Sequence, residues 1–246
     1  MPGRKVPRVL VLAMDTATPT TSVAVGSEAG TLAEVAVRHQ RRHAELLAPA
    51  VRWVLDQAGV EPGSLAGLAV GIGPGLFTGL RVGVSTAKAL AQAWRLPVVA
   101  VPSLDLLAFA HRHAHRTICP TIDARRREVF VALYRVVPGG VVRVTEHQVL
   151  RPDQVAAGIE ARGEDVLLCG DGAFAHRAVF ERLGDHCQLG SVQLAAPSAA
   201  ALVELALPRF LREETSRALD VTPLYLRRPD VDPSVERRLA SERTGS

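Results

Sequence analysis

The sequence predicts an α/β protein made of two similar lobes, each a mixed sheet flanked by helices. The first observation is the order of its segments, β-β-β-α-β-α-β-α, which occurs twice along the chain. The second is that the first strand of each half ends at an aspartate, Asp15 and Asp123. The third is a Gly-x-Gly segment at the same place in each half, residues 73–75 and 170–172. Because so many elements rarely recur in one order by chance, we infer a duplication. We expect Asp15 and Asp123 to lie at equivalent strand ends of the two lobes and to face one cleft.

The segments of the first half follow from their periodicity and from the residues that bound them. Apolar runs between turn residues predict strands, and amphipathic runs predict helices. The helix that starts at His43 is expected to end before Gly59, because glycine commonly follows the last helical residue. The expected strands are Val9–Met14, Ser22–Val25, Thr31–Val37, 65–72 and Val98–Val101, and the expected helices are His43–Ala58, Gly79–Trp94 and 103–115.

The second half repeats this order with one strand-ending aspartate and one arginine-rich turn. The expected strands are Ile118–Ile122, Val129–Val137, Val141–Leu150, Val166–Cys169 and 188–194, and the expected helices are 152–161, 175–183 and Ser198–Leu211. We therefore predict an N-terminal lobe over 6–116 and a smaller C-terminal lobe over 117–226, whose final helix could pack back on the first lobe. Residues 227–246 are charged and poor in apolar side chains, which predicts a mobile tail.

Composition narrows the class of protein. With 246 residues and 48% hydrophobic residues the chain can form a sizeable core. No apolar run is long enough for a membrane span, and the N-terminus does not resemble a signal peptide. The three cysteines, Cys119, Cys169 and Cys187, lack metal-site spacing, which favours buried, reduced thiols. We expect a cytoplasmic protein without a membrane partner.

The charge balance does not predict a nucleic-acid-binding surface. The net charge is only +4, and acidic residues alternate with the arginines. Aromatic residues make up 4% of the chain, which argues against a base-stacking surface. The densest cluster, Arg125-Arg126-Arg127, is interpreted as a solvated hairpin tip in preference to a phosphate contact.

The most informative segment is Gly71–Gly83, which joins an expected strand to an expected helix. One interpretation is a loop that holds a phosphate at a helix N-terminus, with Thr78 as the N-cap. Gly79, Gly83 and Ala87 continue as a stripe of small residues along the helix, however, and a glycine inside a helix costs about 1 kcal/mol relative to alanine. The stripe therefore favours close packing of another element against this helix.

The order of strands and helices, together with its repetition in the second half, resembles the ribonuclease-H-like fold of the actin, hexokinase and Hsp70 ATPase superfamily. Within that superfamily the chain resembles the TsaB (YeaZ) family over about residues 9–226. The segments that carry this resemblance are Leu12-Ala13-Met14-Asp15-Thr16-Ala17-Thr18, His43-Ala44-Glu45-Leu46-Leu47-Ala48-Pro49, Gly73–Gly83, and Ile122-Asp123-Ala124-Arg125 with Glu128-Val129-Phe130.

The resemblance implies a non-catalytic subunit of the complex that forms threonylcarbamoyladenosine on tRNA. The reaction itself would be performed by a TsaD-type transferase. TsaD-like chains carry a His-x-x-x-His metal site on the helix after the strand that matches Val98–Val101, whereas this chain has Ser103 and Leu107 there. Leucine offers no metal ligand. The resemblance further implies a homodimer when alone, recruitment of a TsaE-type ATPase, contact with tRNA only through the complex, and no cofactor.

Two enzymatic alternatives stay open on the sequence. One is a metal-dependent peptidase or acyltransferase like the older glycoprotease descriptions of this family, and the other is a small ATP-dependent kinase of the same fold. The positions that contact nucleotide phosphates in the superfamily correspond to Asp15, Thr16 and Asp123. We interpret them as relics, since a strand-ending aspartate is as often a turn-former. The pairs His39/His43 and His111/His115 are expected in solvated or capping roles in preference to binding a metal.

The helices 43–58 and 79–94 are apolar on more than one side, which predicts that a partner covers them. TsaB-like proteins use this helix pair for the homodimer and, alternatively, for the complex with TsaD. The residues we expect at this interface are Leu46, Leu47, Ala50, Trp53, Val54, Phe77, Gly79, Leu80, Gly83 and Ala87.

Overall fold

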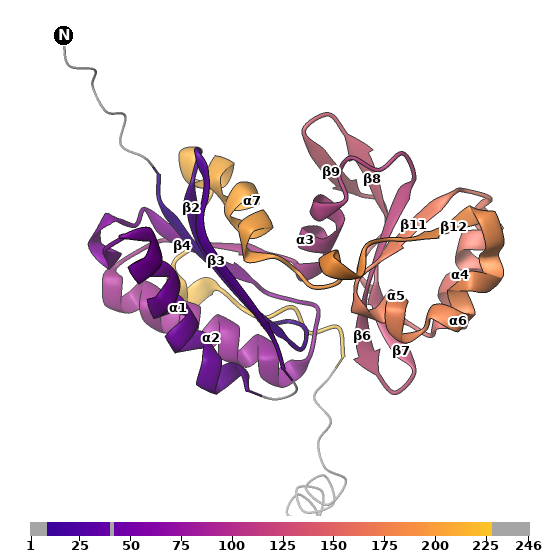
Figure 1. Ribbon diagram of the computed structural model, residues 1–246, viewed down its shortest axis with the longest axis horizontal. Coiled ribbons are helices and arrows are strands. Elements are labelled where there is room, and N and C mark those ends of the chain that lie inside the picture. The colour runs from indigo at the N-terminus through magenta and orange to yellow at the C-terminus, as the bar shows by residue number, and fades with distance from the viewer. Residues whose placement is uncertain (1–8, 40–41, 228–246) are drawn as a thin grey trace, which may run out of the picture.

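The computed structural model describes residues 9–39 and 42–227, which form two α/β lobes side by side (Figure 1). The fold class is confirmed, and the first lobe has the expected element types in the expected order. In the second lobe the expected helix 175–183 is divided into short helices within residues 171–186, and the expected strand 188–194 is a short strand, residues 187–189, followed by a 3-10 turn at residues 192–194. The main differences from the sequence-based boundaries lie in the second lobe.

The first lobe contains a sheet of five strands in the order β3-β2-β1-β4-β5. Strands β1, β4 and β5 are parallel, and β2 and β3 extend the sheet antiparallel to their neighbours. The strands are β1 (Val11–Asp15), β2 (Thr20–Ser27), β3 (Gly30–Arg38), β4 (Gly67–Gly71) and β5 (Val98–Val101), and the helices that follow them are α1 (His43–Ala58), η1 (Pro62–Ser64), α2 (Phe77–Trp94) and α3 (Ser103–Ala110).

Alternating side chains of these strands build two separate cores. Leu12, Met14 and Val70 point to the layer formed by α1 and α2. Val11, Ala13 and Ala69 point to the opposite face, where α7 (Ala199–Leu211) packs with its Leu202 and Ala206 side. The central strands are therefore buried on both faces, which accounts for their continuous apolar sequence.

The second lobe repeats this plan with an added hairpin. Its strands are β6 (Thr117–Arg125), β7 (Glu128–Val131), β8 (Tyr134–Val137), β9 (Gly140–Arg143), β10 (Gln148–Leu150), β11 (Val166–Cys169) and β12 (Cys187–Leu189), with helices α4 (Pro152–Arg162), α5 (Asp171–Ala175), α6 (Arg177–Phe180), η2 (Glu181–His186) and η3 (Val192–Leu194). Their main order, β10-β7-β6-β11-β12, matches that of the first lobe, and β8 pairs with β6 and β9 outside it.

Two of the expected strands are therefore wrong as single units. The segment 129–137 divides into β7 and β8, because the chain leaves the β7 register at Ala132 and Leu133 and turns to pair Tyr134 with Ile118. The segment 141–150 divides in the same way into β9 and β10. Ala132 and Leu133 continue the apolar run, so apolar patterning could not locate the first break, whereas the second break falls on the polar residues 145–147.

The last helix of each half contributes to the other half of the molecule. α3 follows the first sheet but packs on β6 and β9, and it supplies Leu104 and Leu107 to a core of the second lobe. α7 ends the second half but lies on β1, β2 and β4 of the first sheet (Figure 1). The expected helix to residue 115 is shorter, because α3 ends at Ala110. A division of the chain at residue 117 stays a prediction.

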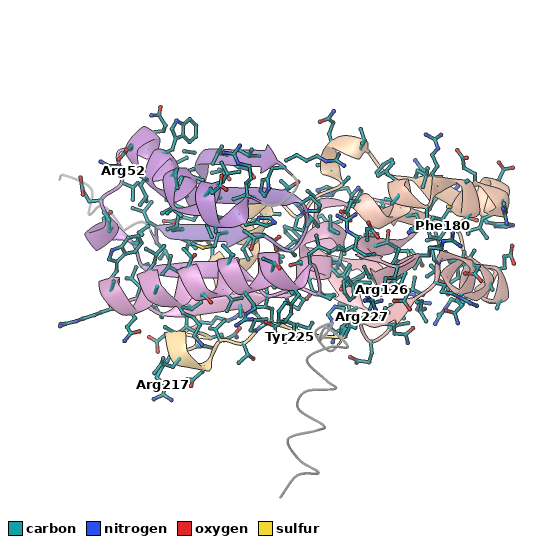
Figure 2. All side chains as sticks on the ribbon, turned by 90° about the horizontal axis from the view of Figure 1, so that it is seen from below. Arg52, Arg126, Phe180, Arg217, Tyr225 and Arg227 are labelled. Carbon is teal, nitrogen blue, oxygen red and sulfur yellow. The ribbon has the colours of Figure 1, made fainter. Side chains whose placement is uncertain are left out.

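A segment after α7 runs back along the first lobe and reaches the second. Ser216 bridges to Val98, and the Lys88 ammonium donates to the carbonyls of Leu219 and Val221 around η4 (Ala218–Asp220). Tyr225 then packs on Phe77 at a ring distance of 5.2 Å. Figure 2 shows Tyr225 and Arg227 at the junction of the lobes. The predicted tail lies, beyond residue 227, outside the described residues.

Within the described residues, α2 and the other helices are too short or too polar to cross a membrane.

Candidate functional site

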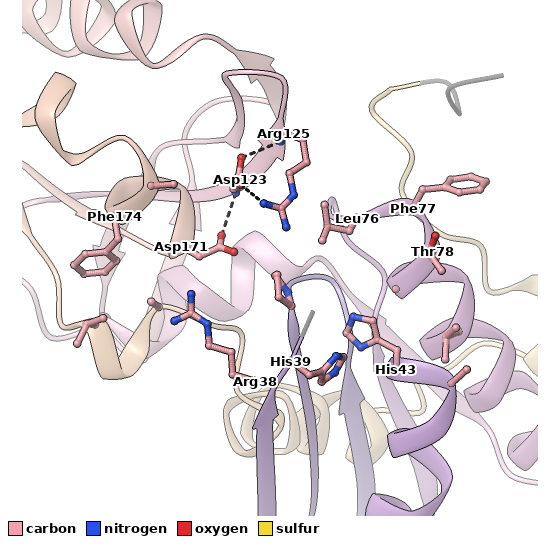
Figure 3. A pocket seen from close by; sticks show the side chains of 17 residues that line it. Arg38, His39, His43, Leu76, Phe77, Thr78, Asp123, Arg125, Asp171 and Phe174 are labelled. Atoms are coloured by element: carbon pink, nitrogen blue, oxygen red, sulfur yellow. Dashed lines mark hydrogen bonds and ion pairs between the residues drawn. The ribbon is translucent and has the colours of Figure 1, made fainter. Parts of the chain in front are cut away.

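A cleft of about 1660 Å³ separates the two lobes. One wall comes from the end of β3 and the first turns of α1 and α2, and the other from the β6–β7 hairpin and α5 (Figure 3). Its charged and polar lining residues are Arg38, His39, His43, Thr78, Asp123, Arg125 and Asp171.

Asp15 does not line this cleft, and the prediction that both strand-end aspartates face one cleft is wrong for it. Its side chain is buried, and the Ser103 hydroxyl donates to its Oδ2 at 2.6 Å. The Ala17 amide donates to Oδ1 at 2.9 Å, which is the Asx turn that the sequence left as an alternative. Burial raises the pKa of Asp15 to about 6, although both hydrogen bonds lower it.

Thr16 and the glycine stripe form one internal contact. The Thr16 hydroxyl donates to the Gly79 carbonyl at 2.7 Å. A Cβ at Gly79 would overlap the Thr16 carbonyl oxygen, and one at Gly83 would overlap the Thr16 hydroxyl. The close packing partner that the stripe predicts is therefore the turn after β1 of the same lobe. The prediction that Gly79 and Gly83 contact a second protein is therefore wrong.

The other expected interface residues fall into a buried group and a group that is at least partly exposed. Leu47, Ala50, Val54, Leu80 and Ala87 are buried in the first-lobe core, so a partner cannot contact them extensively. Trp53 is 48% exposed, and Leu46 and Phe77 are half-buried. Spacing alone could not separate the inward from the outward side, because both sides of these helices carry apolar residues.

Asp123 lies in the cleft and belongs to a small network with Arg125 and Asp171. The Arg125 amide and guanidinium donate to the two oxygens of Asp123 at 2.9 and 3.0 Å. The Asp123 amide donates to Asp171 Oδ1 at 3.0 Å. Burial, and then the charge of Asp123, raise the pKa of Asp171 to about 6, against the lowering effect of Arg125 and Arg38. Sequence reasoning missed Asp171 and Arg38 as cleft residues, although Asp171 stands inside the second Gly-x-Gly segment.

The β6–β7 hairpin tip has unusual backbone geometry. Arg125, Arg126 and Arg127 have φ angles of 63°, 52° and 59°, in the left-handed region that costs a non-glycine residue about 1 kcal/mol or more. Asp123 supports this turn through the Arg125 amide. The tip is therefore an exposed turn, as the sequence predicts, and its backbone conformation is also held in place at the cleft wall by Asp123.

In the first histidine pair, the solvated or capping role that the sequence predicts is wrong for His43, which is buried, whereas His39 is half-buried and accepts the amide of Arg42 at the start of α1. His39 Nε2 and His43 Nδ1 both lie 2.9 Å from the Thr21 hydroxyl, and the two rings meet edge to face at 4.4 Å. His43 is only 7% exposed. Burial, and then the neighbouring His39, lower the pKa of His43 to about 4.

The second pair follows the end of α3. His111 Nδ1 lies 2.9 Å from the Leu107 carbonyl, and His113 and His115 are exposed. Across the part of the chain that the structure describes, no three His, Cys, Asp or Glu side chains are grouped to hold a metal ion. Leu107 and Ser103, which we expect from the resemblance to occupy the positions of the TsaD histidines, are buried in the protein interior.

Comparison with known proteins now assigns the family. The TsaD family model, described as tRNA N6-adenosine threonylcarbamoyltransferase, matches residues 28–234. The tRNA threonylcarbamoyladenosine biosynthesis protein TsaB of Bacillus subtilis is 30% identical over 218 residues, which cover 88% of this chain and 93% of that protein. The crystal structure of YeaZ from Pseudomonas aeruginosa has a TM-score of 0.76 at 32% identity and covers 88% of this chain and 99% of its own.

A more distant structure, component A of the (R)-2-hydroxyglutaryl-CoA dehydratase of Acidaminococcus fermentans, has a TM-score of 0.51 at 12% identity, covering 82% of this chain and 99% of that one. That likeness concerns the fold alone. The fold thus defines a two-lobed α/β protein of the actin and hexokinase type. Within that class, the chain belongs to the TsaB (YeaZ) family.

Proposed function

We propose that this chain is the non-catalytic TsaB-type subunit of the machinery that forms threonylcarbamoyladenosine on tRNA. In this role it binds a TsaD-type transferase, supports its competent conformation and helps recruit a TsaE-type ATPase. Contact with tRNA is made only through the complex, and the protein acts in the cytoplasm. The observation that carries the proposal is family membership over nearly the full length of relatives that are named for this pathway.

The environment of the strand-end residues supports a non-catalytic subunit. Asp15 and Thr16 are both buried and bonded to protein groups, so they are not available to a nucleotide phosphate or its metal. The first turn of α3, where a TsaD chain would hold metal, offers Ser103 to Asp15 and Leu107 to the core. These contacts disfavour both the metallopeptidase and the kinase alternative.

The outward side of α1 and α2 is the surface that we assign to TsaD and, in its absence, to a second copy. Trp53 is the most exposed large apolar side chain on this helix pair. Leu46, Pro49 and Ala89 extend the apolar surface with small or partly buried side chains. Interfaces are commonly anchored by such an aromatic residue. The buried residues of the earlier expectation then act indirectly, by holding the two helices together.

The test is reconstitution of tRNA modification from the purified chain, a TsaD-type transferase, a TsaE-type ATPase, the threonylcarbamoyl adenylate and tRNA. Formation of modified adenosine should require this chain, while the chain alone should neither turn over ATP nor carry stoichiometric metal. ATP turnover or a tightly held metal in the isolated chain would instead support one of the enzymatic alternatives.

A matched pair of variants tests the surface. Trp53→Asp places a charge on the outward side of α1, and Leu211→Asp places the same charge at the end of α7, where Leu211 is 65% exposed. We expect the first variant to lose binding to the transferase and the homodimer by light scattering, and the second to keep both. Normal binding of a folded Trp53→Asp variant would show that the surface lies elsewhere.

A further inference from the structure

The N-terminus of α2 opens onto the cleft without a cap. The helix begins after Leu76, an extended residue whose side chain makes no capping bond, and Thr78 lies inside the first turn where the sequence predicted the cap. The Leu76 amide donates to the Ala17 carbonyl and the Leu80 amide to the Leu76 carbonyl. Within the described residues, the amides of Phe77, Thr78 and Gly79 have no acceptor. Such amides require a partner.

His43 supplies a second, independent donor beside this turn. The Arg42 amide donates to His39 Nδ1 at 3.0 Å, so neutral His39 carries its proton on Nε2 and donates it to the Thr21 hydroxyl. The hydroxyl must then donate to His43 Nδ1, which leaves the His43 proton on Nε2. These hydrogen bonds fix the tautomer of both rings.

The His43 Nε2–H group points toward the first turn of α2. Nε2 lies 3.1 Å from the position that a Cβ of Gly79 would occupy, and both residues line the cleft. His43 is 7% exposed, and its Nε2 has no bonding partner among the described residues. An imidazole N–H on a nearly buried side chain and three uncapped amides therefore lie at one corner of the cleft. Figure 3 shows His43 beside Thr78 at this corner.

We infer that the first turn of α2 and His43 bind the phosphate group of a small molecule. Helix N-termini favour anions through their free amides and their dipole. Three amides, the Thr78 hydroxyl and the imidazole N–H outnumber the two oxygens of a carboxylate and suit the oxygens of a phosphate. The nearly buried His43 would not reach a phosphate of an RNA backbone lying across the surface.

This site differs from the phosphate-contact positions inherited with the fold. Of these positions, Asp15 ends β1 and Thr16 follows it, and both are filled by protein contacts, whereas Asp123 lies on the opposite wall of the cleft. The charged groups around the new site are Arg38 and Arg125 with Asp123 and Asp171, and the Arg125–Asp123 ion pair neutralises part of this charge. Since the pKa of His43 is lowered to about 4, the imidazole acts as a neutral donor near neutral pH.

The experiment is a titration of the full chain with inorganic phosphate, followed by the amide resonances in NMR. We expect saturable shifts of the Thr78 and Gly79 amides, competition by sulfate, and no such shifts with chloride at equal ionic strength. Failure of the wild-type amides of this turn to shift would overturn the inference, whatever the result of the tRNA-modification assay.

Two variants then assign the donors. His43→Asn keeps an acceptor for the Thr21 hydroxyl but removes the Nε2–H, and we expect about tenfold weaker phosphate binding. Thr78→Val removes only the hydroxyl and should weaken binding less. Unchanged affinity in a folded His43→Asn variant would exclude His43 from the site. If that variant fails to fold, the wild-type titration with a shift of the His43 Nε2–H resonance decides the same point.

Discussion

The two lobes end their first strands with the same residue in opposite environments. In the first lobe the Asp15 carboxyl is enclosed, with a donor on each oxygen and no access to the cleft. In the second lobe Asp123 reaches the cleft and forms an ion pair with Arg125, which is itself more than half exposed. Equivalent positions in a duplicated sequence therefore do not imply equivalent chemistry.

Neighbouring elements cause the difference. Gly71 at the end of β4 has no Cβ, and the Asp15 carboxyl fills the space that one would occupy. Ser103 at the start of α3 then closes over the carboxyl. In the second lobe, β11 leads through Gly170 into the five-residue helix α5, and Asp171 accepts the Asp123 amide instead of covering its carboxyl. The first lobe thus has a closed strand end and the second an open one.

The largest effect that we expect compares a helix glycine from each lobe. Gly79→Ala places a Cβ against the Thr16 carbonyl, a backbone atom that cannot move cheaply, and should lower the free energy of unfolding by about 3 kcal/mol. Gly158→Ala in α4 meets open space and should raise it by about 1 kcal/mol. Urea unfolding of both variants measures the contrast. Equal effects would mean that the close contact of α2 with Thr16 is wrongly described.

Much of this contrast could not be predicted from the sequence. Strand-ending aspartates, the Gly-x-Gly segments and the helical periodicity are local signals, and they located the elements of the first lobe well. Whether Asp15 faces a cleft depends on Ser103, 88 residues away in the chain. Likewise, the glycine stripe predicts a close neighbour but not which one, because Thr16 lies 63 residues from Gly79.

The candidate site was predictable only in part for the same reason. Asp123 was predicted at the cleft, whereas the adjacent arginine turn was interpreted as a solvated tip, and Asp171 and Arg38 join them through the packing of the lobes. The spacing of His39 and His43 was noted, but the pair was expected in solvated or capping roles, because their bonds to Thr21 on β2 are not visible in the sequence. Ala132 and Leu133, between β7 and β8, carry no turn signal, so the separation of the β8–β9 hairpin from β7 was missed.

A second, smaller effect is a pH dependence that the closed strand end confers. The folded pKa of Asp15, about 6, lies above the ordinary value of 3.8 for an aspartate, so folding favours the protonated form. Its stabilising contribution is present below about pH 4 and is lost as pH rises through about 6, by on the order of 2 to 3 kcal/mol. Asp171 acts in the same direction, and His43, with its lowered pKa, in the opposite one.

The difference between wild type and Asp15→Asn isolates this group from the others. Relative to the variant, the free energy of unfolding of the wild type should fall as pH is raised from about 4 to about 7. Denaturant unfolding of both proteins across that range is the measurement. Parallel pH profiles would show that Asp15 is ionised in the folded protein at acidic pH and that the strand end is more open than described.

The smallest effect concerns the open strand end. Asp123→Ala removes an ion pair with an arginine side chain that is 59% exposed, together with the bond to the Arg125 amide, and should cost no more than about 1 kcal/mol. Asp15→Ala leaves the Ser103 hydroxyl and the Ala17 amide buried without their acceptor, so the variant should lose about 2 kcal/mol or more of unfolding free energy.

Both variants remove one carboxyl from equivalent positions, which makes each the control for the other. Similar losses of unfolding free energy in the two variants would remove the distinction between a closed and an open lobe. A selective loss in Asp15→Ala would instead place the structural role of the aspartate in the first lobe and leave Asp123 free to serve the cleft.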